Sequence, residues 1–130
     1  MSMELDIEVC LDAVPVETVL ELQKKFPVTC ACDNANAIAR NAIISAWDHP
    51  RAVVSVDEEV SRFLQQLDYH AETVRGARGV IRLGIFYALT ETVVFPFRLS
   101  VETVKEIGAL NLAMDVTGYP CSEESEEDDI

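Results

Sequence analysis

The stretch LDIEVCLD at residues 5–12 decides the fold, because its apolar and polar side chains alternate without a break. Leucine, isoleucine and valine occupy the odd positions, and aspartate, glutamate and cysteine occupy the even ones. A period of two is typical of a strand with one buried face and one solvated face. The sequence therefore predicts a half-buried strand near the start of the chain, with an acidic outer face.

Two helices are predicted in the first half of the chain. Pro15 suits the first turn of a helix whose apolar stripe includes Leu20 and ends before Pro27. An alanine-rich run follows, with apolar residues three and four apart and a capping residue, Asp33 or Asn34, before it. We therefore predict a second helix over residues 34–47.

Serine caps mark the later helices. Ser55 is followed by Glu58 at capping-box spacing, which predicts one continuous helix that ends near Gly76 or Gly79. Ser100 is placed to cap a last short helix. The apolar residues assigned to the buried face of that last helix are Val101, Val104 and Ile107.

Extended segments alternate with these helices. The strands predicted after the first are residues 28–32, 52–56, 80–87, 93–97 and 110–117. Residues 93–97 are expected to pair with residues 80–87 as a hairpin, at a sheet edge because of Pro96. This order predicts an α+β fold: a four- to five-stranded, largely antiparallel sheet with helices packed mainly on one face, related to a ferredoxin-like sandwich. A partly solvated second face is indicated by Asp6, Glu8, Asp12, Asn111, Asp115 and Thr117.

The length of 130 residues predicts a single folded domain. Residues 1–120 are periodic and rich in apolar side chains, so we predict that they form one α+β domain. The last ten residues, CSEESEEDDI, hold six acids and no base. Runs of like charge are usually disordered, so residues 121–130 are predicted as a disordered acidic tail.

The chain is strongly acidic, with 23 acidic residues against 10 basic ones and a formal net charge of -13. Without the six acids of the tail, 17 acids against 10 bases remain, so the predicted domain is acidic on its own. This charge repels nucleic-acid phosphates and anionic lipid headgroups, and it speeds association with a basic protein. We expect a basic protein partner, and neither nucleic acid nor a membrane.

The sequence also predicts a cytoplasmic location. The first ten residues carry acids where a secretory signal would carry positive charge, and no apolar stretch reaches the length of a membrane span. A domain of this size needs no disulfide framework. The cysteines expected as free thiols are Cys10, Cys30, Cys32 and Cys121.

The words Leu99-Ser100-Val101-Glu102 and Gly108-Ala109-Leu110, with Asp115 after them, resemble the closing segment of a bacterial family, domain-of-unknown-function family 4279. The preceding helix, with Glu58-Glu59 before Phe63-Leu64, and residues 80–87 are similar in kind to that family. The resemblance covers roughly half of the chain. It implies an α+β sandwich in a bacterial cytoplasm, and it implies no functional residues.

Cys30, Cys32 and His49 are the residues from which a ligand pocket would be built. One C-x-C pair is too few for structural zinc, which uses four ligands. A thiol nucleophile needs a basic neighbour, and the imidazoles of this chain are those of His49 and His70. We predict no catalytic residue, no metal, no cofactor and no enzyme activity. The alternative is a small-ligand sensor or enzyme with a pocket near Cys30, Cys32 and His49.

The acids near the start of the chain are the strongest indication of function. Trp47 is interpreted as either a core residue or a partner anchor, and the first interpretation is favoured. Because tryptophan is enriched at interface hot spots, Trp47 and the neighbouring Asp48 are still counted among the candidate binding residues. The sequence predicts a small acidic binding protein, an immunity-type inhibitor that occludes a basic toxin such as a nuclease. Self-association through residues 93–97 is a third hypothesis, so monomer and homodimer both stay open. The predicted partner-binding residues are Glu4, Asp6, Glu8, Asp12, Trp47 and Asp48.

Overall fold

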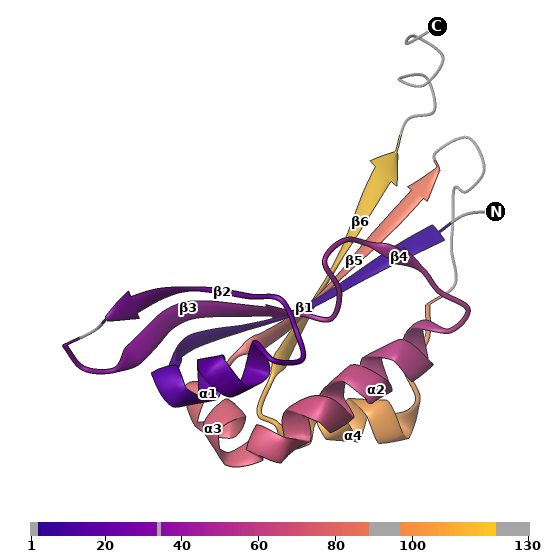
Figure 1. The fold of residues 1–130 in the computed structure, drawn as a ribbon. Coiled ribbons are helices and arrows are strands. Elements are labelled where there is room, and N and C mark those ends of the chain that lie inside the picture. The colour runs from indigo at the N-terminus through magenta and orange to yellow at the C-terminus, as the bar shows by residue number, and fades with distance from the viewer. Residues whose placement is uncertain (1–2, 34, 89–96, 122–130) are drawn as a thin grey trace, which may run out of the picture.

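One mixed sheet organises the chain, and its strands are β1 (Met3–Pro15), β2 (Val28–Asp33), β3 (Ile38–Ser45), β4 (Arg51–Ala52), β5 (Val80–Ala88) and β6 (Ala113–Cys121). The computed structural model describes residues 3–33, 35–88 and 97–121. In these residues the sheet order is β2-β3-β1-β5-β6, so the long strand β1 is central. The short strand β4 pairs with the first residues of β1, beyond the end of β3. Figure 1 shows the strong twist of this sheet.

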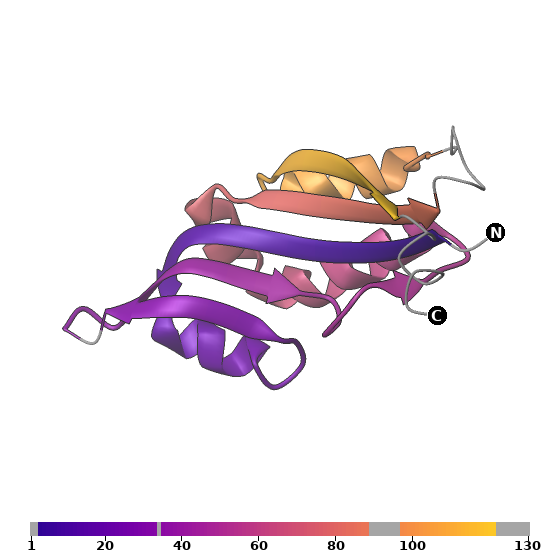
Figure 2. The ribbon, with the colours of Figure 1, turned by 90° about the horizontal axis from the view of Figure 1, so that it is seen from above.

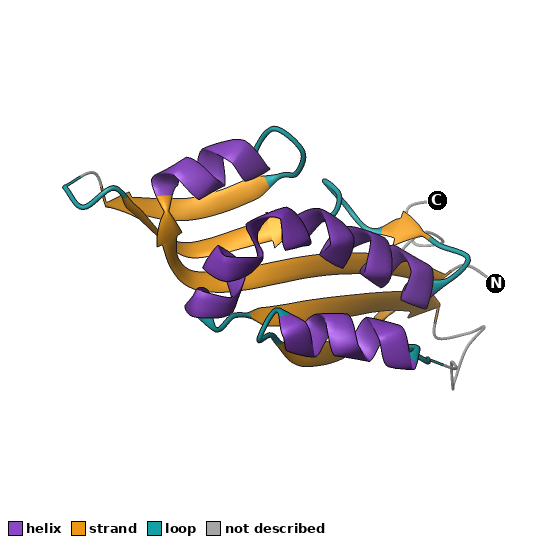
Figure 3. Cartoon of the chain, turned by 90° about the horizontal axis from the view of Figure 1, so that it is seen from below, coloured by secondary structure: helices purple, strands orange, loops and turns teal. Residues whose placement is uncertain are grey.

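Four α-helices of the described chain are α1 (Val16–Leu22), α2 (Val56–Leu67), α3 (Ala71–Ala77) and α4 (Val101–Ala109). A 3₁₀ turn, η1 (Asp68–His70), joins α2 to α3. The helices lie on one face of the sheet (Figure 3), and the opposite face is seen directly in Figure 2. Within the described ranges, no helix has both the length and the apolar character needed to cross a bilayer.

The predicted α+β architecture with helices on one face is confirmed, with two differences. The sheet has six strands when the two-residue β4 is included. Strand β6 is parallel to β5, whereas the other pairings are antiparallel. The parallel pairing follows from the route of the chain. Helix α4 lies between β5 and β6 in sequence and returns the chain to the end of the sheet where β5 begins, so β6 runs in the same direction as β5.

The core lies between the sheet and the helices and explains the alternation in β1. Four of its β1 members are at most 1% exposed and occupy every second position, namely Leu5, Ile7, Val9 and Leu11, and Val14 adds a fifth. Strand β5 adds Ile81, Leu83 and Ile85, and α2 adds Val60, Phe63, Leu64 and Leu67. Burying one such side chain stabilises the fold by about 1.5–3 kcal/mol, so the odd positions of β1 fix which face meets the helices.

The alanine-rich run predicted as a helix over residues 34–47 is instead the strand β3, in a hairpin with β2. Its buried residues are Ala39, Ala42 and Ile44. Asn41 has a φ of 51°, and the register against β2 shifts beside it, so the strand holds one extra residue as a β-bulge. The bulge creates a spacing of three between Ala39 and Ala42, which imitates a helical period. The predicted helix is therefore wrong.

The predicted serine caps are confirmed, but the long helix is interrupted. Ser55 Oγ accepts the backbone N–H of Glu58 at 3.2 Å, and Ser100 Oγ accepts the backbone N–H of Thr103 at 3.2 Å. The helix that begins after Ser55 is not continuous, because η1 separates α2 from α3. Arg78 ends α3 in the left-handed conformation, with a φ of 50°.

Helix α4 buries Ile107, as predicted, but not the two valines assigned to the same face. Val101 and Val104 are 66% and 53% exposed, and the buried residues are Thr103 and Ile107. The hydroxyl of Thr103 is paired with Ser100 Oγ at 3.1 Å, so this polar side chain is buried at little cost. A valine pattern alone therefore misplaced the helix face. Leu20 of α1, also assigned to a buried stripe, is 56% exposed.

Two predicted strands differ from the structure by several residues. The strand predicted at residues 110–117 begins at Ala113 and ends at Cys121, so Cys121 belongs to the folded domain rather than to the tail. Residues 52–56 are not one strand, because β4 ends at Ala52 and α2 begins at Val56. Residues 93–96 and 122–130, which were predicted as a strand and as most of the tail, lie outside the described residues.

Candidate protein-binding face

The open face of β1 carries its charged side chains in a line. Glu4, Asp6 and Glu8 alternate with the buried residues of β1, so they project away from the helices. Successive members are about 7 Å apart along the strand. Asp12 continues the series beside a cavity. In the part of the chain that the structure describes, no helix or strand covers this face (Figure 2).

Two neighbouring strands add charges to the same face. Glu8 is paired in register with Arg82 of β5, and Arg82 is paired with Asp115 of β6. Residues paired across strands share a face, so Arg82 stands in register between Glu8 and Asp115 on the open face. The face is therefore acidic along β1, with a positive charge near its centre.

An aromatic pair lies at one end of the face. Phe86 of β5 is in register with Glu4 on one side and with Tyr119 on the other. The rings of Phe86 and Tyr119 are stacked, with centroids 4.7 Å apart and planes at 17°. Gly84 leaves space for these rings, because a Cβ there would come within 3.1 Å of Tyr119. Tyr119 remains 45% exposed, so a partner can contact it.

Partial burial affects two groups on this face. Burial raises the pKa of Asp6, and the backbone hydrogen bond at Ile7 offsets part of that effect. Burial also raises the pKa of the Cys10 thiol; Arg82 opposes this effect, and the carboxylates of Glu8 and Asp115 add to it. A protonated thiol is a poor nucleophile. The Cys10 thiol is therefore kept in its protonated, less nucleophilic form.

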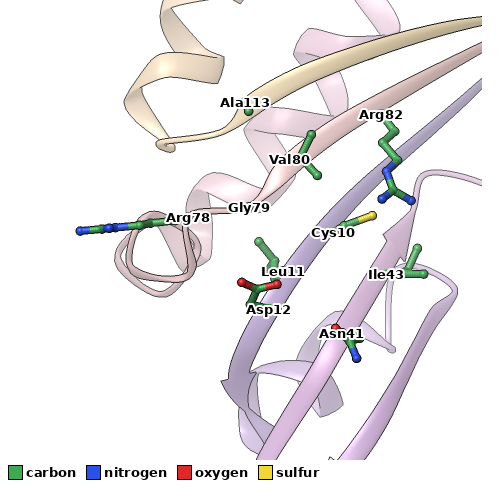
Figure 4. A pocket seen from close by; sticks show the side chains of 10 residues that line it. All are labelled: Cys10, Leu11, Asp12, Asn41, Ile43, Arg78, Gly79, Val80, Arg82 and Ala113. Carbon is green, nitrogen blue, oxygen red and sulfur yellow. The ribbon is translucent and has the colours of Figure 1, made fainter.

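A cavity of about 340 Å³ opens where β1 and β5 meet the end of α3. Figure 4 shows the side chain of Arg82 reaching toward Cys10, with Asn41 on the neighbouring strand and Arg78 directed outward. The volume suits a small ligand. Its wall includes Asp12 together with Arg78 and Arg82, so the cavity adjoins the acidic line but carries both signs of charge.

The structure does not bring Cys30, Cys32 and His49 together. Cys32 is in register with Ala39 near the start of β3, whereas His49 follows the opposite end of that strand. Six residues of extended chain, about 20 Å, separate Ala39 from Ser45. The predicted pocket shared by these three residues is therefore absent from the described chain.

Trp47 and Asp48 lie apart from the acidic line. Trp47 is half-buried against the core, beside Phe63 of α2, so it packs on the helix side of the sheet. The guanidinium of Arg51 stacks over its ring at 5.0 Å. Asp48 is exposed in the segment between β3 and β4. The six predicted partner-binding residues thus form two groups, of which Glu4, Asp6, Glu8 and Asp12 share the open face.

Sequence reasoning missed the contributions of β5 and β6 to this face. Arg82 and Phe86 occupy alternate positions of a strand that was predicted, and this alternation was the available signal. Asp115 was predicted to face solvent, but its place beside Arg82 depends on the parallel register of β6. That register was not readable from local periodicity.

Comparisons with family models, with curated proteins and with solved structures found no match to this chain. The resemblance to the bacterial family of unknown function therefore stays a prediction. Within residues 3–33, 35–88 and 97–121, no group of three histidine, cysteine or acidic side chains is placed to hold a metal ion. The open face, with its line of carboxylates, its aromatic pair and the cavity beside Asp12, is the candidate functional site.

Proposed function

We propose that the open face of the sheet binds a basic protein, and that the protein is an immunity-type inhibitor that covers a basic toxin such as a nuclease. The observation that carries this proposal is the line of β1 carboxylates on an uncovered sheet face. Carboxylates presented in this way occupy the positions where a basic active site would hold phosphates. Inhibition would result from occlusion, without chemistry by this chain.

The energetics of the acidic line support a role in binding. Like charges along one strand face repel one another, and Asp6 is partly desolvated as well. Neutral polar residues at these positions would allow the same fold with less repulsion. A cationic partner removes the repulsion on binding and also accelerates the encounter. The arrangement thus disfavours the free protein and favours a complex.

The dimensions of the face set what a partner must contact. From Glu4 to Asp12 the line of carboxylates is about 26 Å long. Across the sheet, from β2 to β6, the five strands span about 19 Å. The product is about 500 Å², below the roughly 800 Å² that each partner buries in an interface of standard size. The aromatic pair already lies within this area, so a partner that buries a standard interface must also contact loops at the rim of the sheet.

Arg82 and Tyr119 provide selectivity on the open face. The positive charge of Arg82 repels a uniformly basic surface at the centre of the face and favours a partner with one acid there. Tyr119 offers an exposed ring on a rigid strand, a residue type that dominates binding free energy in many interfaces. We therefore expect a folded basic domain and not a simple polycation.

The parent chain is first crosslinked to the basic protein that it captures from a bacterial lysate. The experiment then compares how strongly two triple variants of the full chain bind that captured protein. One variant carries Asp6→Asn, Glu8→Gln and Asp12→Asn. The matched control carries Glu17→Gln, Glu72→Gln and Glu102→Gln, which remove the same charge from exposed helix positions. Circular dichroism checks that both variants fold.

The face variant should bind the retained partner at least about tenfold more weakly, a loss of about 1.4 kcal/mol, and should show a flatter dependence on salt. The control should bind within about threefold of the parent chain. Added parent protein should also inhibit the partner's enzymatic activity, and the face variant should not. Binding that ignores ionic strength and survives loss of the three β1 carboxylates would overturn the proposal.

A further inference from the structure

A pair of thiols lies on the end strand β2, away from the acidic face. Cys30 and Cys32 are two residues apart in an extended segment, so their side chains project to the same side. Their Sγ atoms are 3.6 Å apart. A disulfide needs the sulfurs to approach to about 2.05 Å, so closure requires about 1.5 Å of movement.

The two thiols differ in access. Cys32 is exposed, whereas Cys30 is half-buried and packs against the core. Burial raises the pKa of the Cys30 thiol, and its hydrogen bond and charge interaction with Cys32 raise it further. A reagent in solution therefore meets Cys32 first, and Cys30 is held beside it as a second thiol.

The backbone around Cys30 has room to move. Cys30 lies opposite the bulge of β3, where the register between β2 and β3 shifts from Thr29 to Ala31. Strand β2 is also the last strand of the described sheet, so its outer edge is not held by another strand in that sheet order. Cα atoms two residues apart in an ideal strand are about 6.6 Å apart, at the upper end of the range for disulfides. An interrupted ladder allows the slight pucker that closure needs.

The other cysteines do not compete for this pair. Cys10 faces the open side of the sheet, and Cys121 ends β6 at the opposite edge. Four strand spacings, about 19 Å, separate the two edges. Intramolecular pairing within the described chain is therefore restricted to Cys30 with Cys32.

We propose that Cys30 and Cys32 form a reversible redox pair that exchanges with small disulfides such as glutathione disulfide. The thiolate of Cys32 attacks one sulfur of glutathione disulfide, the S–S bond breaks, and one glutathione thiolate leaves. Cys30 then loses its proton, attacks the Cys32 sulfur and expels the second glutathione. Two protein thiols are oxidised, one glutathione disulfide is reduced to two glutathione molecules, and the two protons pass to those products.

The resulting bond is reversible and not a structural staple. It closes a loop of three residues, so it restricts the unfolded chain very little. It is also exposed, because Cys32 lies at the surface, and exposed disulfides near the geometric limit are readily reduced. The pair therefore responds to the ratio of glutathione to its disulfide and adds little to stability in either state.

The test uses the full chain with Cys10→Ser and Cys121→Ser, treated with glutathione disulfide and then alkylated. Trypsin releases residues 26–40, which contain Cys30 and Cys32 and neither of the other cysteine positions. Mass spectrometry should show this peptide two hydrogens lighter and unalkylated, and dithiothreitol should restore two alkylation sites. A peptide that accumulates with one glutathione attached and no internal disulfide would overturn the proposal.

Single substitutions and a synthetic peptide separate the roles of the two thiols. With Cys30→Ser the glutathione adduct on Cys32 should persist. With Cys32→Ser the adduct should form about tenfold more slowly, since burial both shields Cys30 and keeps it protonated. The folded chain should close its disulfide at least about tenfold faster than a synthetic peptide of residues 26–40, because the fold holds the sulfurs together. Equal rates in chain and peptide would refute this role of the fold.

Discussion

Replacement of Gly79 by alanine tests how tightly β1 and β5 are joined beside the cavity. Gly79 is buried between the left-handed residue Arg78 and the start of β5. A Cβ at this position would meet the backbone carbonyl oxygen of Cys10, and it would lie 2.5 Å from Cδ2 of Leu11. The carbonyl cannot retreat freely, because Cys10 is paired with Val80.

The expected loss of stability can be worked from this contact. Overpacking of a well-packed site costs about 1–3 kcal/mol, and a backbone obstacle places Gly79→Ala at the upper end. The reduced freedom of the unfolded chain returns about 0.4–1 kcal/mol. The net loss is about 2 kcal/mol. For a domain of this size, 1 kcal/mol corresponds to about 4 °C, so the Tm should fall by about 8 °C.

Thermal unfolding followed by circular dichroism measures this loss against two control variants. Gly76 in α3 and Gly108 in α4 have no heavy atom within 4 Å of the position that an alanine methyl group would occupy, so alanine there gains helix propensity without a clash. Gly76→Ala and Gly108→Ala should each stabilise the fold by about 0.5–1 kcal/mol. If Gly79→Ala unfolds at the parental temperature while these controls are stabilised, the tight approach of β1 and β5 is refuted.

Asp57→Asn should destabilise the fold by about 1 kcal/mol at pH 7, because hydrogen bonds from the Ser100 backbone N–H, at 2.7 Å, and from the Thr103 hydroxyl lower the pKa of Asp57. Urea unfolding should show that the difference in stability shrinks as the pH falls below 3.8, and a difference that stays constant would contradict this prediction. Asp6→Asn should stabilise by about 0.5 kcal/mol at pH 7, since the raised pKa of Asp6 makes stability fall as pH rises above 3.8, and no gain at neutral pH would refute that sign. Asn41→Ala should cost about 1 kcal/mol at the φ of 51° while Asn41→Gly costs less, and equal unfolding midpoints would exclude backbone strain.

Local chemistry explains which elements were predictable from the sequence. The face of β1 follows from strict alternation, and the starts of α2 and α4 follow from serine side chains that accept N–H groups three residues ahead. Each of these signals depends on neighbours within a few residues. The acids Asp6, Glu8 and Asp12 were assigned to a solvated face on the same basis.

Long-range pairing explains the errors. The bulge at Asn41 appears in the register of β3 against β2, a pairing between separate segments, and it changed the apparent period of the sequence. The place of Arg82 between Glu8 and Asp115 depends on two registers, one of them parallel. The exposure of Val104 depends on how α4 packs against other elements. None of these arrangements is encoded in the periodicity of a single segment.

The exposure of β6 has a consequence for the lifetime of the open face. All nine residues of β6 are exposed, so this strand is held mainly by backbone pairing with β5, and burial of apolar side chains contributes little. Its amide protons should therefore exchange through local opening, at a free energy below that of global unfolding. Opening starts from the Cys121 end, because Leu110 and Leu112 anchor the other end in the core. A partner that spans β1 and β6 would close this opening, and slower amide exchange in β6 would report that the face is occupied.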